Sequence, residues 1–389
     1  MLPVDLPGTV RDALLAPLVD HHCHGVRRDD LSRAQFELLS GEGGGPAPPG
    51  TTHFDTPFGA AVRRWCAPLL DLEPHAPPAV YLARRAELGA AEVNRRLLAG
   101  SGVVAFLVDA SHEELEVLTA AEMGRHGGAA ADELVRIERI ERDVAATAEL
   151  AVDYLDNLGE ELTAKAARAV GLKTVIGALC GLDFDPARPS RGAVIAAANR
   201  RLADPKEPLT DHVLLRYLLW SAVDVARERG LPVQFHTGFG GPVHHGAGGP
   251  AGEPHRADPA RLSAFAAALQ PLGVPVILLH CYPFHRQAAH LAGIFPHVYV
   301  DVGLAPPHGT AAAARVMDEL LELAPFHKQL FSSGCRGLAE TGYLGALTYR
   351  RALAGALQAR IAAGEWSTSD AARIAHMIGS GNARRIYRL

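Results

Sequence analysis

Two histidines near the N-terminus, spaced one residue apart, are the first residues in this chain that could do chemistry. His22 and His24 follow the apolar start of a segment that reads LVDHHCH from residue 18, and the pattern predicts a short buried strand over residues 18–22. Alternate side chains of an extended chain point to the same face, so both imidazoles can aim at one point just past the strand's end. Imidazoles that converge in this way suit a divalent metal such as zinc. The pair alone does not exclude a polar turn in which the two histidines are incidental.

Other polar side chains stand at the ends of further predicted strands. We expect these strands over residues 102–109, 133–138, 170–179, 231–236, 274–280, 298–302 and 328–333. The polar residues near their ends are Arg136, Glu138, Lys173, His236, His280, Asp301 and the run from Ser332 to Cys335. Chance alone does not readily place four histidines at three strand ends of one barrel, so their positions strengthen the prediction of a metal site.

Apolar strands that alternate with helices predict a parallel sheet, and eight such units predict a closed (β/α)8 TIM-like barrel. An open doubly wound sheet is the alternative, but no glycine-rich phosphate turn follows the first strand. We expect one domain over residues 1–389, with a helical insertion at about 25–100 and closing helices at about 340–389. The long helices are predicted at 78–99, 143–168 and 207–229, and a capped helix is predicted to open at 111. In such barrels the chemistry lies at the carboxyl ends of the strands.

Composition narrows the function classes. The chain has 389 residues, of which 48% are hydrophobic, so it can bury a large core. Its net charge of −5 provides no basic footprint for nucleic acid, and no stretch of about 18 apolar residues suits a membrane. The N-terminus lacks the pattern of a signal peptide, and the five scattered cysteines fit reduced thiols in a cytoplasm. We therefore expect a cytoplasmic protein whose partner is a small-molecule substrate, with a homo-oligomer possible.

The chain resembles the metal-dependent amidohydrolase superfamily, of the amidohydrolase-2 type, and within it the branch also found fused to glutamine synthetase. The resemblance lies in DHHCH (20–24), ELVRIE (133–138), VGLKT (170–174), VQFHTGFG (233–240), LLHCYPFHRQAAHLA (278–292), VYVDVGL (298–304), LAETGYLGAL (338–347) and NARRIYRL (382–389). It implies that His22 and His24 bind a first metal. It also implies that His236 and His280 serve that metal or a second one. Lys173 lies on the strand where many members carry a carbamylated lysine that bridges two metals. One or two divalent ions are thus expected, zinc by default, although manganese, iron or nickel would also suit imidazole.

The sequence departs from the family pattern at strand eight. Members usually end this strand with Ser-Ser-Asp, and that aspartate binds metal and moves a proton from the bound water. The matching residue here is Gly334, and an acid expected just after the HTGFG stretch is replaced by Gly241. The candidates to replace the missing carboxylate are Glu138, Asp301, His285 and Cys335. Glu138, Asp301 and His280 are the expected catalytic residues.

The residues after His280 point to a carboxylated substrate, because arginine suits bidentate carboxylate binding. The candidates for substrate binding are Arg136, Tyr282, His285 and Arg286. A glycine-rich loop over residues 238–258, which holds His244, His245 and His255, is expected to cover the site as a lid.

Three functions fit this pattern. The first is a metal-dependent hydrolase acting on a C–N bond, of amide type, in a small carboxylated substrate. The second is a non-hydrolytic lyase such as a decarboxylase. The third is a catalytically impaired barrel that binds a ligand or a partner.

Overall fold

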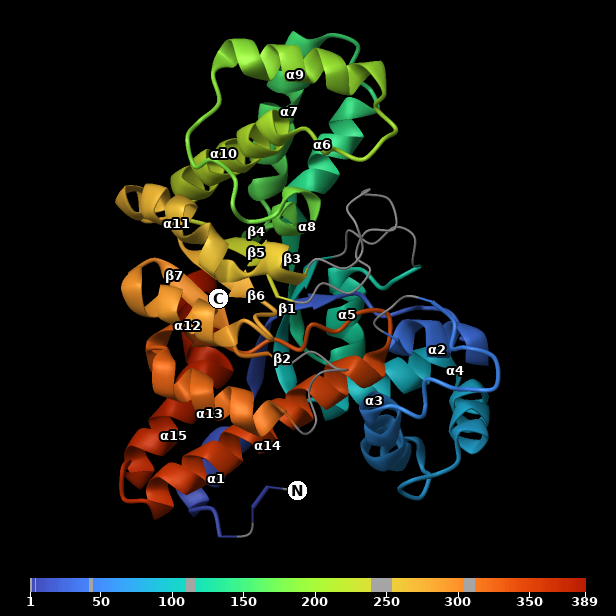
Figure 1. The fold of residues 1–389 in the computed structure, drawn as a ribbon. Coiled ribbons are helices and arrows are strands. Elements are labelled where there is room, and N and C mark those ends of the chain that lie inside the picture. Colours follow the sequence, from blue (N-terminus) through green and yellow to red (C-terminus); the bar gives the residue numbers. More distant parts are fainter. Residues whose placement is uncertain (1, 4, 42–44, 110–115, 239–253, 304–311) are drawn as a thin grey trace. The chain divides into compact units, whose positions relative to one another are not determined.

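The computed structural model describes residues 2–3, 5–41, 45–109, 116–238, 254–303 and 312–389 (Figure 1). Its eight strands are neighbours in sequence order, from β1 to β8, in one sheet. The pairings from β3 to β7, and that of β1 with β2, are parallel. This order, with helices between the strands, is that of a (β/α)8 barrel and confirms the predicted fold class. Over the described residues, no helix is both long and apolar enough to cross a membrane.

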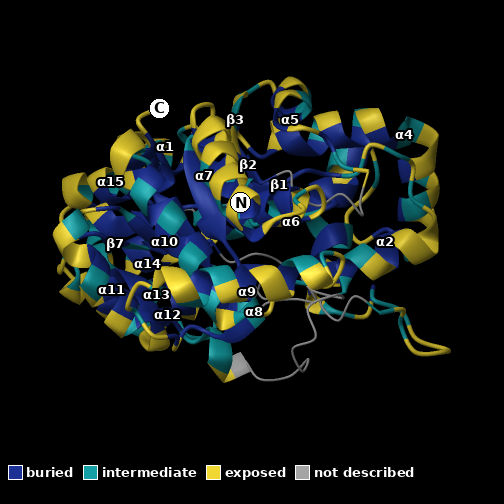
Figure 2. Cartoon of the chain, turned by 90° about the horizontal axis from the view of Figure 1, so that it is seen from above, coloured by how far each residue is buried: buried dark blue, intermediate teal, exposed yellow. Residues whose placement is uncertain are grey.

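Contacts divide the chain into two compact units, which are described separately here. Unit 1 comprises residues 1–132 and 301–389, and unit 2 comprises residues 133–300. In both, the strands are mostly buried while the helices expose one face (Figure 2).

Unit 1 contains β1 (Leu18–His24), β2 (Val103–Asp109), β8 (Gln329–Leu330) and the start of β3 (Ala130–Arg136). The helices described in it are α1 (Gly8–Leu15), α2 (Arg33–Ser40), α3 (Pro57–Ala61), η1 (Val62–Cys66), η2 (Ala67–Leu70), α4 (Pro78–Gly100), α5 (Ala120–Gly127), α13 (Ala313–Leu323), η6 (Phe326–Lys328), α14 (Ala339–Ala362), α15 (Thr368–His376), η7 (Met377–Gly381) and α16 (Asn382–Tyr387). Between β1 and β2 the described residues form helices and no strand.

Two boundaries in unit 1 differ from the prediction. β1 continues to His24 instead of ending at residue 22, and all seven of its residues are buried. A register shift interrupts its pairing with β2 between Asp20 and Cys23, as in a β-bulge. The predicted opening of the next helix, at residue 111, lies outside the described residues. Residues 116–119 are not helical, and α5 begins at Ala120, where Thr119 and Glu122 form a capping box that satisfies the first backbone N–H groups.

Unit 2 contains the rest of β3, β4 (Gly171–Thr174), β5 (Val233–His236), β6 (Val276–Leu279) and β7 (Val298–Asp301), whose last residue belongs to unit 1. The helices described in it are α6 (Ile137–Ala145), α7 (Ala151–Ala166), α8 (Ile176–Cys180), α9 (Arg191–Ala203), α10 (His212–Arg229), η3 (Pro254–Ala257), η4 (Pro259–Leu262), α11 (Ser263–Leu269), η5 (Gln270–Leu272) and α12 (His285–Ile294). Helices α6, α7, α9 and α10 pack together as one cluster (Figure 1).

Unit 2 corrects three predictions. The long helix expected over 143–168 is two helices, α6 and α7, with a break at residues 146–150. The strand expected over 170–179 ends at Thr174, and α8 follows. Helix α9 was not predicted; its N-cap is Ser190, whose hydroxyl accepts a hydrogen bond from the Ala193 N–H.

Candidate active site

In unit 1, His22 and His24 present their rings edge to face, with centroids 5.0 Å apart. The Nδ1 of His24 lies 3.0 Å from the backbone oxygen of Asp109. A carbonyl oxygen can only accept, so Nδ1 is the donor, and in the neutral imidazole Nε2 then carries the lone pair. Metal-binding histidines are commonly oriented in this way by a second hydrogen bond. The two rings therefore lie close together, and the hydrogen bond orients His24 as metal-binding histidines commonly are.

Asp109 is a site residue that the sequence reasoning missed. It ends β2, pairs in register with His24, and its Oδ2 lies 3.6 Å from the same Nδ1. Its place at the end of a predicted strand was the signal that could have identified it.

The turn after β8 is hydrogen-bonded to the backbone of both histidines. The N–H of Gly334 donates to the oxygen of His22 over 3.2 Å, and the N–H of His24 donates to the oxygen of Cys335 over 2.6 Å. Gly334 has a φ of +58°, a left-handed conformation that glycine adopts without a steric penalty. The position where the family carries its aspartate therefore lies beside His22.

The Cys335 thiol is buried, and its Sγ donates to the oxygen of Leu338 over 3.3 Å. Burial raises the pKa of this thiol to about 12. Cys335 is therefore protonated near neutrality and does not fit a thiolate ligand.

Two buried carboxylates of unit 1 are engaged with β8 and its end. Asp301 accepts from the Gly303 N–H over 2.6 Å and from the Ser332 hydroxyl over 2.8 Å. Asp20 accepts from the N–H of Ser333 over 2.9 Å and from its hydroxyl, while burial raises the pKa of Asp20 to about 7. Each oxygen of Asp301 thus already accepts a hydrogen bond from a residue of unit 1.

In unit 2, His236 ends β5 and His280 follows β6, with ring centroids 5.2 Å apart. His280 has a φ of +54°, which is uncommon for a residue other than glycine. Gly238 makes this conformation possible, because a Cβ atom there would lie 2.0 Å from the backbone oxygen of His280. Strained conformations of this kind cluster at active sites, so the outlier supports a functional role for His280.

Lys173 lies on β4 in register with Arg136 of β3 and with Gln234 of β5. Partners in register on parallel strands point to the same face, and His236 follows Gln234 by two residues. Lys173, Gln234 and His236 therefore share one face of the sheet. Lys173 is buried, with 1% of its surface exposed, and Gln234, which sequence reasoning missed, is buried beside it.

Glu138 lies in the first turn of α6, not on β3 as predicted. Its Oε1 accepts hydrogen bonds from the Thr174 hydroxyl and, over 2.9 Å, from the Val175 N–H. Its Oε2 is shielded from solvent and has no hydrogen-bond partner within the described residues. Burial raises the pKa of Glu138, whereas these donors lower it by a smaller amount. The carboxyl group is thus held by one oxygen and available at the other.

The predicted substrate-binding residues after β6 lie on and before α12. The rings of Tyr282 and His285 are stacked, with centroids 6.1 Å apart and an interplanar angle of 7°. His285 is buried, and Arg286, in the first turn of α12, is exposed. Of the predicted lid, residues 239–253 lie outside the described residues, and they include Gly241, His244 and His245; His255 is exposed in η3.

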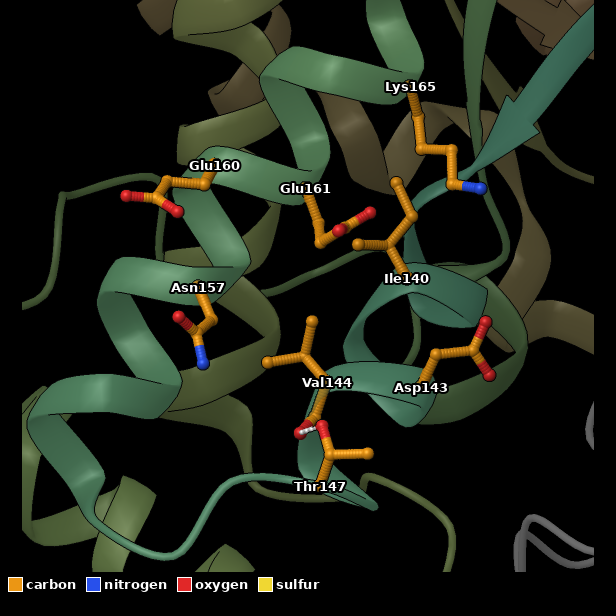
Figure 3. A pocket seen from close by; sticks show the side chains of 8 residues that line it. All are labelled: Ile140, Asp143, Val144, Thr147, Asn157, Glu160, Glu161 and Lys165. Carbon is orange, nitrogen blue, oxygen red and sulfur yellow. Dashed lines mark hydrogen bonds between the residues drawn. The ribbon is translucent and has the colours of Figure 1, made fainter.

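The two histidine pairs belong to different units, His22 and His24 to unit 1 and His236 and His280 to unit 2. Among the described residues, no group of three or more histidine, cysteine, aspartate or glutamate side chains could hold a metal ion. A surface hollow between α6 and α7 is lined by Ile140, Asp143, Val144, Thr147, Asn157, Glu160, Glu161 and Lys165 (Figure 3). None of the predicted site residues lines it.

Comparison with known proteins decides the family. The Amidohydrolase family profile matches residues 19–389. The chain belongs to the amidohydrolase family. Members of this family are generally metal-dependent enzymes. The family match therefore supports an enzyme of this family.

The chain is also similar to individual proteins. Protein fluG of Emericella nidulans is 28% identical over 231 residues, which cover 57% of this chain and 26% of that protein. This chain thus spans about a quarter of that relative's length. A proposed metal-dependent hydrolase from Lactobacillus casei ATCC 334 superposes with a TM-score of 0.83 at 22% identity over 98% of both chains. A uronate isomerase from Thermotoga maritima superposes with a TM-score of 0.65 at 12% identity over 97% of both chains. At these identities the structures establish the fold.

The donor chemistry of both histidine pairs fits the metal that the amidohydrolase family implies. The ring centroids lie 5.0 Å apart in the His22–His24 pair and 5.2 Å apart in the His236–His280 pair. Because Nδ1 of His24 donates to the Asp109 carbonyl, Nε2 is the atom of His24 that would bind the metal.

Proposed function

We propose that this protein is a metal-dependent hydrolase that acts on a C–N bond, of amide type, in a small carboxylated substrate. The observation that carries the proposal is the orientation of His24 by the Asp109 carbonyl, with His22 beside it. In this proposal His22 and His24 bind a divalent ion at the carboxyl end of β1, and His236 and His280 bind that ion or a second one. Zinc is the default because its usual ligands include imidazole.

A divalent ion at this position would lower the pKa of a water molecule towards about 7 and polarise the scissile carbonyl. Glu138 would move the proton, in place of the aspartate that Gly334 replaces. Its Oε2 has no competing hydrogen bond within the described residues, whereas both oxygens of Asp301 accept bonds and the Cys335 thiol is protonated. These hydrogen bonds therefore favour Glu138 over Asp301 and Cys335 as the residue that moves the proton.

Arg136 and Arg286 would bind the substrate carboxylate, and Tyr282 stacked on His285 would form an aromatic wall beside it. Arg136 ends β3 next to Lys173, and Arg286 begins α12 and is exposed. Guanidinium groups bind carboxylates through two parallel hydrogen bonds, so they suit this role.

The proposal is tested by metal analysis of protein purified without chelator, together with amine release from a panel of small carboxylated amides. We expect one or two equivalents of metal per chain and turnover that a chelator abolishes. Protein that retains no metal when supplied with zinc, and releases no amine, would refute it. Metal retention with CO2 release instead would favour the decarboxylase, a reaction that Gly334 makes a specific second candidate.

Gly334→Asp is expected to tighten metal binding by about tenfold, in line with groups that orient metal sites, and to raise amide hydrolysis. The left-handed φ of +58° costs most side chains roughly 1–2 kcal/mol, but aspartate tolerates it better than most. Gly334→Ala carries the same strain without the carboxylate and is the matched control. If the wild type already turns over amides near the enzyme median of about 10 s⁻¹ and Gly334→Asp is no better, the missing aspartate does not limit the reaction.

Lys173 tests whether one or two ions bind. A carbamylated lysine would bridge two metals, and Lys173 is buried on the face of the sheet that it shares with His236. In that case intact-protein mass should show the added carboxyl group, and activity should rise with bicarbonate. An unmodified Lys173 beside one equivalent of metal would exclude the two-metal form.

A further inference from the structure

A buried cluster in unit 1 joins the helical insertion to the start of α14. The Oε1 atom of Glu340, in the first turn of α14, accepts a hydrogen bond from the Tyr81 hydroxyl over 2.9 Å and one from Arg85 Nε over 2.9 Å. Tyr81 and Arg85 lie on α4. The Glu340 side chain is fully buried and that of Arg85 is 4% exposed. We call these three residues the α4–α14 cluster.

Glu340 lies shortly after the turn that carries Gly334. The backbone of this turn is hydrogen-bonded to the backbone of β1, the strand that carries His22 and His24. The hydrogen bonds of Gly334 to His22 and of His24 to Cys335 begin this contact, and Gly337 extends it by donating to the oxygen of Gly25 over 3.1 Å. Displacing the start of α14 would therefore displace the turn against which β1 is held.

Helix α4 also grips the segment that leaves β1. The side chain of Asn94 donates to the backbone oxygen of Arg27 over 2.8 Å, and Asp30 accepts from the Ala90 N–H over 2.6 Å. Gly89 has a φ of +74° and interrupts the helix, so Asp30 caps its second half. Helix α4 thus contacts both the segment that leaves β1 and the start of α14, which follows the turn that carries Gly334.

The Oε2 atom of Glu340 is buried and has no hydrogen-bond partner within the described residues. A buried carboxylate satisfied at only one oxygen is destabilising compared with one satisfied at both. Unit 2 offers a comparison made of the same residue types. There Arg201 donates to both oxygens of Glu141, over 2.7 and 3.3 Å, and the Tyr154 hydroxyl donates over 2.9 Å. The α4–α14 cluster therefore departs from the arrangement that would best serve stability alone.

We propose that Tyr81, Arg85 and Glu340 are positioning residues, which hold the turn after β8 against β1 and so keep His22 and His24 in their metal-binding geometry. This inference rests on the proposed metal site. It assigns a role to the LAETGYLGAL segment that the proposed reaction does not use, and it makes the helical insertion part of the metal centre's support.

The experiment compares two single hydroxyl deletions, Tyr81→Phe and Tyr154→Phe. Each removes one hydrogen bond to a buried glutamate that keeps its arginine. The zinc dissociation constant of the whole protein is measured by competition with a chromophoric chelator, at a temperature well below the melting point of every variant. We expect Tyr81→Phe to weaken zinc binding by about tenfold, the lower end of the effect of groups that orient metal ligands. Tyr154→Phe should lower the melting temperature without changing zinc affinity.

Glu340→Gln keeps an oxygen for both donors, whereas Glu340→Ala keeps none, so zinc affinity should fall in the order wild type, Glu340→Gln, Glu340→Ala. Wild-type zinc affinity in Tyr81→Phe and in Glu340→Gln alike would overturn the inference and leave the proposed function standing. An equal loss in Tyr154→Phe would also overturn it, since general destabilisation would then explain both. A wild-type protein that binds no zinc would instead refute the proposed function, and this inference with it.

Discussion

His24→Ala is expected to remove the metal and to lower kcat/KM by about 10³-fold or more, because a catalytic ion is worth several kcal/mol of transition-state stabilisation. His22→Ala should have a similar effect, since the two rings share one face with centroids 5.0 Å apart. Metal content after dialysis and kcat/KM for the best amide of the panel are the measurements.

The matched control is His290→Ala, which removes an exposed imidazole from α12. It should keep both metal and activity. Full metal occupancy in His24→Ala would show that the oriented imidazole is a structural feature, and the proposed ligand set would be wrong.

Glu138→Gln is expected to lower kcat by about 10²–10⁴-fold, the range typical for the loss of a general acid–base group. Glutamine can still accept hydrogen bonds from Thr174 and Val175 through its carbonyl oxygen, so the fold and the metal content should be kept. Activity within a few-fold of wild type would exclude Glu138 as the proton-transfer residue.

The pH profile tests the same residue with a defined sign. Glu138 acts as a base only when ionised, and burial raises its pKa, so the acidic limb of kcat/KM should lie above the ordinary range of a glutamate. The Thr174 hydroxyl and the nearby charge of Arg136 lower this pKa, while the neighbouring Cys180 is a buried neutral thiol. Thr174→Val removes a donor to the carboxylate and should move the limb to higher pH. Thr174→Ser keeps a hydroxyl and should leave it near the wild-type position.

The order of the elements and the place of the histidines could be predicted because both depend on neighbouring residues. Apolar runs separated by helical patterns predicted eight parallel strands, and the spacing of His22 and His24 predicted their shared face. The His236 and His280 positions at strand ends followed from the same reasoning. Boundaries were less predictable: Glu138 was placed on a strand because its segment alternates, although the chain turns into α6 one residue earlier.

Only the tertiary structure decided which residues far apart in the sequence contact one another. The tautomer of His24 depends on the Asp109 carbonyl, 85 residues away. The engagement of Asp301 by Ser332, and the bond from Tyr81 to Glu340, likewise join segments whose separation no local pattern encodes. Residue types and spacing determine which side chains reach the carboxyl ends of the strands. Which of their oxygens and nitrogens remain available for chemistry depends on hydrogen bonds that form only when distant segments pack together, because each such bond occupies a donor and an acceptor from different elements.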